Sequence, residues 1–329
     1  MKKSGVFCIA FLTLVMLSCK DSGPKQRFLP PSTGGINSLM VVMDTELWKG
    51  GVGDKIREHF AASVLGLPQG EPKFTIIQIP PQVFKGATAY SRSVLFVEQD
   101  TVSRAYIKTD VYAKPQKVAV IKGETYNDFA ENIDKLADSA IGSFKAVEIA
   151  EAQRRFTRSL SKEKAFEEEF GIRLKVPSLY KVGKHEKNFV WMDIQIPKGT
   201  MNIIAYQMPL NSFVNDSTFV SDIVKMRDSI GRKYVPGPYE DTFMMTEKAF
   251  SPYVFSAEIG GKKAAKASGI WEINGYPMAG PFITYIINDK ENNRKLVLEG
   301  FTFAPSAEKR DYMFELDAIL RTVEFNKGS

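Results

Sequence analysis

The sequence has 329 residues, of which 44% are hydrophobic and 25% are charged, and its formal net charge is +6. At about 150 residues per domain this length fits two domains or one large domain, and the composition is that of a protein with a packed core. Disordered, collagen-like and multi-span membrane proteins are therefore excluded. Basic and acidic residues are mixed along the chain, so we expect no nucleic acid among its partners.

The N-terminus has the pattern of a secretory signal peptide. Lys2 and Lys3 precede an apolar run, Val6–Leu17. This run is shorter than the roughly 20 apolar residues that a membrane-spanning helix needs. It fits the apolar segment of a leader that is removed on export.

The end of this run, Met16–Cys19, resembles a bacterial lipobox, with Met16 at a position where Leu is more usual. We predict cleavage after residue 18 and acylation of Cys19 with fatty-acyl chains such as palmitate. Two or three acyl chains anchor a protein stably to a membrane, whereas one chain binds marginally. The alternative is an ordinary signal peptide followed by a chance cysteine.

Cysteine usage favours acylation. Cys8 lies in the predicted leader, so Cys19 is the only cysteine of the predicted mature chain. A disulfide within that chain and a thiolate zinc site are then impossible. Acylation would also remove a reactive thiol from an exported protein.

The segment after Cys19 is rich in proline and glycine. Residues 19–35 include Pro24, Pro30 and Pro31, a composition typical of a tether between a membrane and a folded domain. Lys20 directly follows the predicted lipid-bearing residue and is not Asp, which by analogy with Gram-negative sorting favours the outer membrane. The sequence leaves open whether the protein faces the periplasm or the cell surface.

In the first half, short apolar runs bounded by turn residues predict strands. A helix capped by Asp44 or Thr45 is expected to contain Leu47 and Trp48 and to continue after the break at Gly50. The predicted strands are Leu39–Met43, Phe74–Ile79, Val94–Val97, Ala105–Ile107 and Val118–Ile121.

From Thr125 the apolar spacing becomes that of a long amphipathic helix. Ser161 is expected to cap a shorter helix that ends at Gly171. We interpret the helical stretch Thr125–Gly171 as the joint between two strand-rich halves. The apolar stripe of the long helix consists of Phe129, Ile133, Leu136, Ala140, Phe144 and Val147.

The second half predicts strands interrupted by one helix and followed by another. The helices are expected around Phe219–Ile230 and from Pro305 to Val323. Phe189–Ile196 and Met201–Met208 form a predicted hairpin. The other predicted strands are Ile172–Pro177, Phe243–Thr246, Tyr253–Ile259, Ala265–Ile273, Phe282–Ile287 and Lys295–Phe303.

This order predicts an α+β fold, in which two strand-rich halves are joined by a long helix and mostly antiparallel sheets carry packed helices. In its order of elements, the second half resembles the PsbP-like α/β sandwich. The predicted organisation is a lipoprotein signal peptide at 1–18, a tether at 19–35, an N-terminal α+β domain at 36–160 and a C-terminal α+β domain at 161–329.

Common catalytic and binding motifs are absent from the sequence, including the P-loop, the nucleophile elbow, the zincin motif and the dinucleotide fingerprint. His59 and His185 lie in different halves beside charged residues, which favours solvated histidines over ligands or bases. Asp134 and Asp138 are expected on the solvent face of the long helix. We therefore expect no catalytic residue, no metal site and no cofactor.

Two segments, 233–241 and 268–281, combine aromatic residues with glycine and proline. One hypothesis is a recognition groove, because Tyr and Trp offer an apolar face and a hydrogen-bonding tip. The alternative, which we favour, is that these residues close one end of the sheet and cover the core. A glycosidase-like pair of carboxylates is a further alternative. The candidate ligand loop comprises Tyr234, Tyr239, Glu240, Asp241, Trp271 and Glu272.

Several blocks of the sequence resemble an uncharacterised lipoprotein family of Bacteroidota, a family with a domain of unknown function. The resemblance covers nearly the whole predicted mature chain. It implies a lipid-anchored protein of a Gram-negative envelope and no activity that can be assigned to any residue. The blocks are Ile36–Phe60, Leu67–Phe74, Ile230–Tyr239, Trp271–Glu272, Met278–Phe282 and Glu299–Tyr312.

We therefore expect a lipid-anchored cell-envelope protein that is held to the outer membrane by acylated Cys19. Its biochemical activity is unknown, and the absence of catalytic motifs favours non-enzymatic binding of an envelope protein, glycan or lipid partner, or a role in assembly. The alternative is a hydrolase of cell-wall or polysaccharide material that uses Glu240, Asp241 or Glu272.

Overall fold

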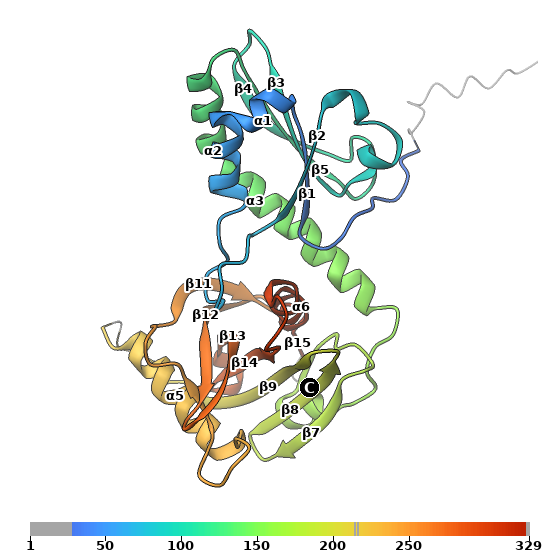
Figure 1. Ribbon diagram of the computed structural model, residues 1–329. Coiled ribbons are helices and arrows are strands. Elements are labelled where there is room, and N and C mark those ends of the chain that lie inside the picture. The colour runs from blue at the N-terminus through green and yellow to red at the C-terminus, as the bar shows by residue number, and fades with distance from the viewer. Residues whose placement is uncertain (1–27, 214, 216, 327–329) are drawn as a thin grey trace, which may run out of the picture.

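The computed structural model describes residues 28–213, 215 and 217–326. Two strand-rich halves are joined by a long helix (Figure 1), so the predicted α+β class is confirmed. The predicted leader at 1–18 and Cys19 lie outside the described residues. Among the helices of the described part, none is both long and apolar enough to cross a membrane.

The N-terminal half contains a five-stranded sheet with the order β2-β1-β3-β5-β4. Neighbours along β2-β1-β3-β5 are parallel, and β4 is antiparallel to β5. This sheet is therefore mixed, whereas mostly antiparallel pairing was predicted. Strands β1 and β2 can be parallel because α1 and α2 form a crossover connection between them. The bounds are β1 Ser38–Val42, α1 Thr45–Lys49, α2 Gly51–Phe60, β2 Thr75–Ile79, β3 Ser93–Gln99, β4 Arg104–Thr109 and β5 Lys117–Gly123.

Both faces of this sheet are covered, which explains the unbroken apolar run of its first strand. Leu39 and Val41 pack on the side of α2 and the long helix. Met40 and Val42 pack in a smaller cluster on the opposite face. The alternation of side chains along a strand produces this division.

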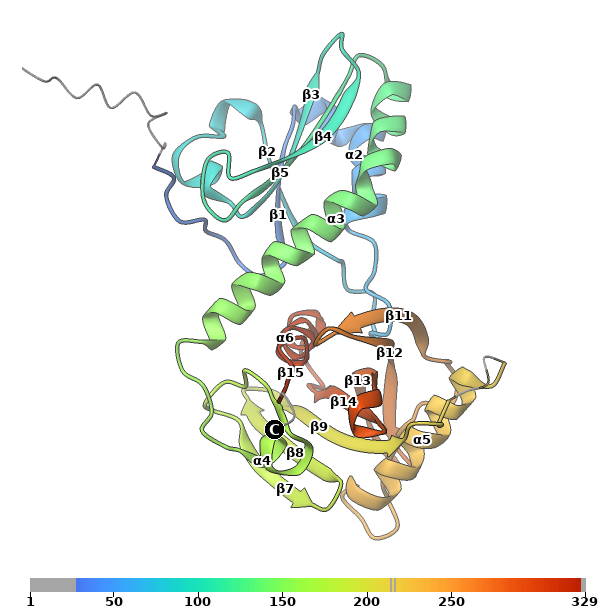
Figure 2. The same ribbon diagram turned by 180° about the vertical axis from the view of Figure 1, so that it is seen from behind.

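The long helix α3 spans Tyr126–Phe156. Its start is a capping box, in which Thr125 and Asp128 each accept a hydrogen bond from the other's backbone N–H. The first part of α3 packs on α2, β4 and β5, and its later part contacts α6 of the C-terminal half. Both views show α3 running from one half to the other (Figures 1 and 2).

The C-terminal half is built on a strongly curled antiparallel sheet with the order β10-β12-β13-β14-β9-β8-β7, and β11 also pairs with β12. Helix α6 packs on one face and α5 on the other. The bounds are α4 Ala165–Phe170, β6 Ile172–Arg173, β7 Lys181–Glu186, β8 Phe189–Ile196, β9 Gly199–Pro209, α5 Phe219–Tyr234, β10 Met244–Thr246, β11 Tyr253–Ile259, β12 Lys262–Ile273, β13 Tyr276–Asp289, β14 Arg294–Phe303, α6 Arg310–Leu320 and β15 Glu324–Phe325.

A buried ion pair fixes α5 on this sheet. Arg227 of α5 donates two hydrogen bonds to Glu299 of β14, at 2.9 and 2.7 Å. Thr284 donates to the same carboxylate, and the guanidinium also donates to Thr246. Each nitrogen of the guanidinium and each oxygen of the carboxylate therefore has a hydrogen-bond partner, which is the condition under which a buried pair is tolerated.

Residues 30–35, which were predicted to be part of the tether, lie against the N-terminal half. The backbone N–H of Ser32 donates to Lys114 and that of Thr33 donates to Tyr90. Buried Arg92 donates to the carbonyls of Gly34 and Gly35, both at 3.1 Å. This part of the segment is therefore held by the folded protein.

Candidate functional site

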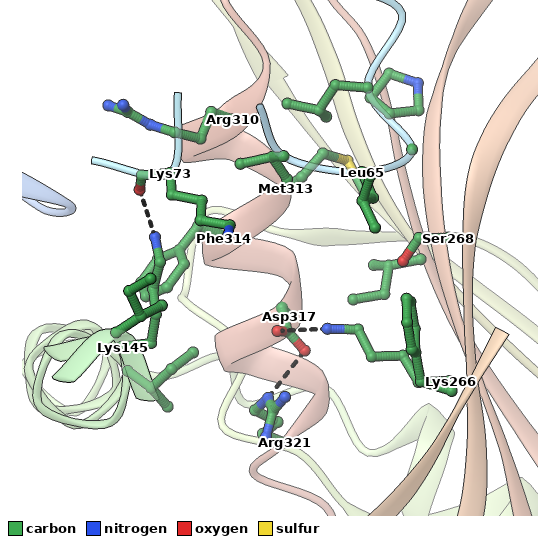
Figure 3. Close-up of a pocket in the computed structure, with 18 of the residues that line it drawn as sticks. Leu65, Lys73, Lys145, Lys266, Ser268, Arg310, Met313, Phe314, Asp317 and Arg321 are labelled. Carbon is green, nitrogen blue, oxygen red and sulfur yellow. Dashed lines mark hydrogen bonds and ion pairs between the residues drawn. The ribbon is translucent and has the colours of Figure 1, made fainter. Parts of the chain in front are cut away.

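A pocket of about 740 Å³ lies between the two halves. This volume is within the range of small-molecule sites. Its walls come from α3, α6 and strands β11–β13, and from the loop between α2 and β2. Figure 3 shows α6 at the back of the pocket, with Lys145 and Lys266 approaching it from opposite sides.

The loop between α2 and β2, residues 62–73, extends from the N-terminal half onto the C-terminal sheet. Its base is closed by hydrogen bonds from the Lys73 N–H to the Ala62 carbonyl and from the Val64 N–H to the Glu71 carbonyl, both 2.8 Å. At its tip Gly66 has φ +84°, and a Cβ there would lie 3.0 Å from the backbone N of Gly269. The left-handed conformation and the close approach to β12 both favour glycine at this position.

Helix α3 presents small residues to the pocket. Gly142, Ala146 and Ala150 are spaced four apart and therefore lie on one face of the helix. A Cβ added at Gly142 would meet no atom within 4 Å. The volume next to α3 is thus open because these side chains are short.

Helix α6 contributes a carboxylate shared by two cations. Lys266 of β12 contacts one oxygen of Asp317 at 3.2 Å, and Arg321 contacts the other at 3.0 Å. Tyr285 donates its hydroxyl hydrogen to the same side chain. Burial opposes ionisation of Asp317, but Lys266 and Arg321 lower its pKa below the usual value. Two positive charges therefore face a single negative charge at this end of the pocket.

Lys145 lies at the opposite side of the pocket and is enclosed by aromatic rings. Its Nζ lies 4.3 Å from the ring centroid of Phe74 and 5.2 Å from that of Phe314. It donates hydrogen bonds to Asn37 Oδ1 and to the Lys73 carbonyl, both 2.6 Å. Burial lowers the pKa of Lys145 to about 7, and the positive charge of Arg310 adds to this effect.

The two halves are joined beside the pocket by Glu71. Its carboxylate accepts hydrogen bonds from the backbone N–H groups of Lys309, at 2.8 and 2.9 Å, and of Arg310, at 2.7 Å. These groups are at the N-terminus of α6, where an anion is favourable. The Arg310 side chain in turn donates to the Pro72 carbonyl and to Thr75, both at 3.0 Å.

The candidate ligand loop is split between core and surface. Tyr234 and Trp271 are buried, with 5% and 2% of their surface exposed. Tyr234 stacks on Phe189 at 4.1 Å between ring centroids, and Trp271 packs edge-on against Phe301 at 5.8 Å. The side chains of Tyr234 and Trp271 therefore belong to the core of the C-terminal half.

The other candidate residues lie elsewhere on the C-terminal half. Tyr239, Glu240 and Asp241 are exposed in the turn before β10, and Tyr239 packs edge-on against Tyr276. Glu272 is half-buried on β12, opposite Met245 and Ala279. None of these residues lines the pocket between the halves.

The two histidines contact carboxylates near the surface. His59 lies 2.8 Å from Asp134, which also pairs with Lys55, and His185 lies 3.4 Å from Glu169. Across the described residues, no group of three or more His, Cys, Asp or Glu side chains is arranged to hold a metal ion.

No motif or spacing in the sequence marks Lys145, Lys266, Asp317 or Glu71 as a site residue. A signal for the pocket was present in α3, where Gly142, Ala146 and Ala150 repeat at a spacing of four. Lys266 and Asp317 are separated by 51 residues, so their pairing depends on the packing of α6 against the sheet.

The fold and pocket define a two-part α+β protein with a small-molecule-sized cavity between its parts. Residues 32–157 match a domain of unknown function (DUF8532), and residues 159–322 match a second domain of unknown function (DUF4837). The chain therefore carries two domains of unknown function, one in each half.

Matches to individual proteins are distant. Among solved structures, LpqN of Mycobacterium tuberculosis, described as involved in cell envelope biogenesis, is similar at 12% identity and a TM-score of 0.28. The match covers 46% of this chain and 82% of LpqN. No curated protein matches the sequence.

Proposed function

We propose that this protein is a lipid-anchored protein of the cell envelope that binds a small ligand, without catalysis, in the pocket between its two domains. The pocket is the observation that supports ligand binding. It has the volume of a small-molecule site, its walls are chiefly apolar, and a few charged groups converge on it. The lipobox-like Met16–Cys19 supports the anchor, and Lys20 directly after it supports an outer-membrane location by analogy with Gram-negative sorting.

The pocket is a better candidate for ligand binding than the candidate ligand loop. Two aromatic side chains of that loop, Tyr234 and Trp271, are buried in the core. The hydrolase alternative has no support from the pocket, because Glu240, Asp241 and Glu272 all lie outside it. Within the pocket, Asp317 is already engaged by Lys266 and Arg321.

The test is native mass spectrometry of the protein extracted from its own envelope, comparing the wild type with Gly142→Leu and Gly142→Ala. Leu at position 142 would extend into open pocket space, whereas Ala adds only a methyl group. Both variants replace a helical glycine, so both should be stabilised, by about 0.5–1 kcal/mol in the case of Ala.

We expect wild type and Gly142→Ala to retain the same bound small molecule and Gly142→Leu to lose it. The mass of the denatured wild-type chain should correspond to a chain that begins at acylated Cys19. Equal ligand content in both variants would refute binding in this pocket, and an unmodified thiol or an intact leader would refute the anchor.

A further inference from the structure

The pocket is lined by more positively charged than negatively charged side chains. Of the lining residues in the described chain, five are basic and one is acidic. Arg310 is paired with Asp311, which does not line the pocket, at 2.9 Å. Asp317 is shared by Lys266 and Arg321, so this pair of cations retains an excess positive charge. The basic lining residues are Lys73, Lys145, Lys266, Arg310 and Arg321.

The remaining walls are apolar and partly open to water. Leu65 from the 62–73 loop and Phe255 from β11 both line the pocket, yet they are 51% and 49% exposed. Ile141 and Ile149 of α3 and Met313 of α6 also line the cavity. Covering such side chains contributes about 25 cal/mol per Å² of apolar surface removed from water.

We infer that the ligand of this pocket is a single-chain amphiphile with one anionic head group, whose apolar chain lies along α3 and the 62–73 loop and whose head group pairs with Lys266 and Arg321. This inference rests on the proposed function and specifies its ligand class. Lys145 is a weaker partner for the anion because two of its hydrogen-bond donors already serve Asn37 and Lys73.

A carboxylate and a phosphate monoester share the chemistry that this site would recognise, because both accept charge-assisted hydrogen bonds from Lys and Arg. A neutral sugar or an uncharged peptide would form no charge-assisted hydrogen bond with Lys266 and Arg321 and would therefore gain less from this end of the pocket. The apolar walls and the cationic end therefore favour an anionic amphiphile.

The experiment uses photocrosslinking of the acylated protein in vesicles of zwitterionic phospholipid. Three diazirine-bearing probes with the same alkyl chain are compared: a fatty acid, a monoacyl phosphate and a fatty alcohol. Labelled residues are mapped by peptide mass spectrometry. Lys266→Met removes the proposed head-group contact, and Lys263→Met is its control, because Lys263 is exposed on the same strand and does not line the pocket.

We expect at least one anionic probe to label peptides of α3, α6 or the 62–73 loop, and the alcohol to label them about tenfold less, the ratio that a difference of about 1.4 kcal/mol produces. The relative labelling by fatty acid and monoacyl phosphate identifies the head group. Lys266→Met should reduce anionic labelling by a similar factor, Lys263→Met should not, and Gly142→Leu should abolish it.

Equal labelling by the alcohol and the anionic probes, or labelling confined to other peptides, would overturn the inference. Different results would refute the proposed function and the proposed ligand class. If Gly142→Leu removes a native ligand while neither anionic probe enters the pocket, binding stands and the ligand class is wrong. If Gly142→Leu changes neither the native ligand content nor the labelling, the pocket is not a binding site.

Discussion

Lys145 is the residue whose protonation state depends most on the fold around the pocket. Its Nζ is enclosed by Phe74 and Phe314, and burial lowers its pKa from 10.5 to about 7. Between these two values the unfolded chain holds a proton that the folded chain has released. The free energy of unfolding should therefore rise with pH across this interval, by at most about 1.4 kcal/mol per pH unit.

We predict that replacing Lys145 with Met removes this pH-dependent contribution. Urea unfolding of wild type and Lys145→Met between pH 7 and 9.5 should give curves whose difference changes with pH, with the wild type gaining stability more steeply. Lys135→Met, at an exposed position on the same helix, should retain the wild-type slope. A pH-independent difference between wild type and Lys145→Met would contradict the lowered pKa.

At the scale of a single element, α6 begins where the other half of the protein supplies an acceptor. Glu71 accepts three hydrogen bonds from the backbone N–H groups of Lys309 and Arg310. Glu71→Ala should leave these donors without that acceptor and lower the free energy of unfolding by about 1–3 kcal/mol. Hydrogen exchange of the first turn of α6 should also accelerate. Gln69→Ala, exposed in the same loop, should change neither quantity, and unchanged exchange in Glu71→Ala would argue against the cap.

The same element shows which helix boundaries the sequence could predict. The start of α3 is encoded locally by Thr125 and Asp128, and it was predicted correctly. Helix α6 was expected from Pro305 but begins at Arg310, because its cap comes from Glu71, a residue 238 positions away from Lys309. Sequence patterns report local hydrogen bonding and cannot report a cap supplied by another part of the fold.

Among strands and site residues too, features encoded locally in the sequence could be predicted, whereas features that depend on distant parts of the fold could not. Tyr253–Ile259 was predicted with its observed bounds, whereas β7 was missed because Lys181–Glu186 is an edge strand that is mostly polar. Composition identified Trp271 as notable, but its role in the core depends on the curl of the sheet around α5. The pocket was missed because its walls come from both halves.

In the molecule as a whole, α3 couples the unfolding of one half to the unfolding of the other. Its apolar stripe from Phe129 to Phe144 belongs to the N-terminal core, and its continuation, Ala152 and Phe156, belongs to the C-terminal core. Unfolding either half would therefore expose apolar surface on the same helix. The hydrogen bonds of Glu71 and Arg310 across the boundary add to this coupling.

This arrangement predicts a single thermal transition for the wild-type protein, with equal calorimetric and van't Hoff enthalpies. Glu71→Ala combined with Arg310→Met removes the hydrogen bonds that these two side chains make across the boundary but leaves α3 intact, so the two cores should lose part of their coupling. Differential scanning calorimetry should then resolve a broader or split transition. Two transitions in the wild type would show instead that the two halves unfold independently and that the shared helix does not couple them.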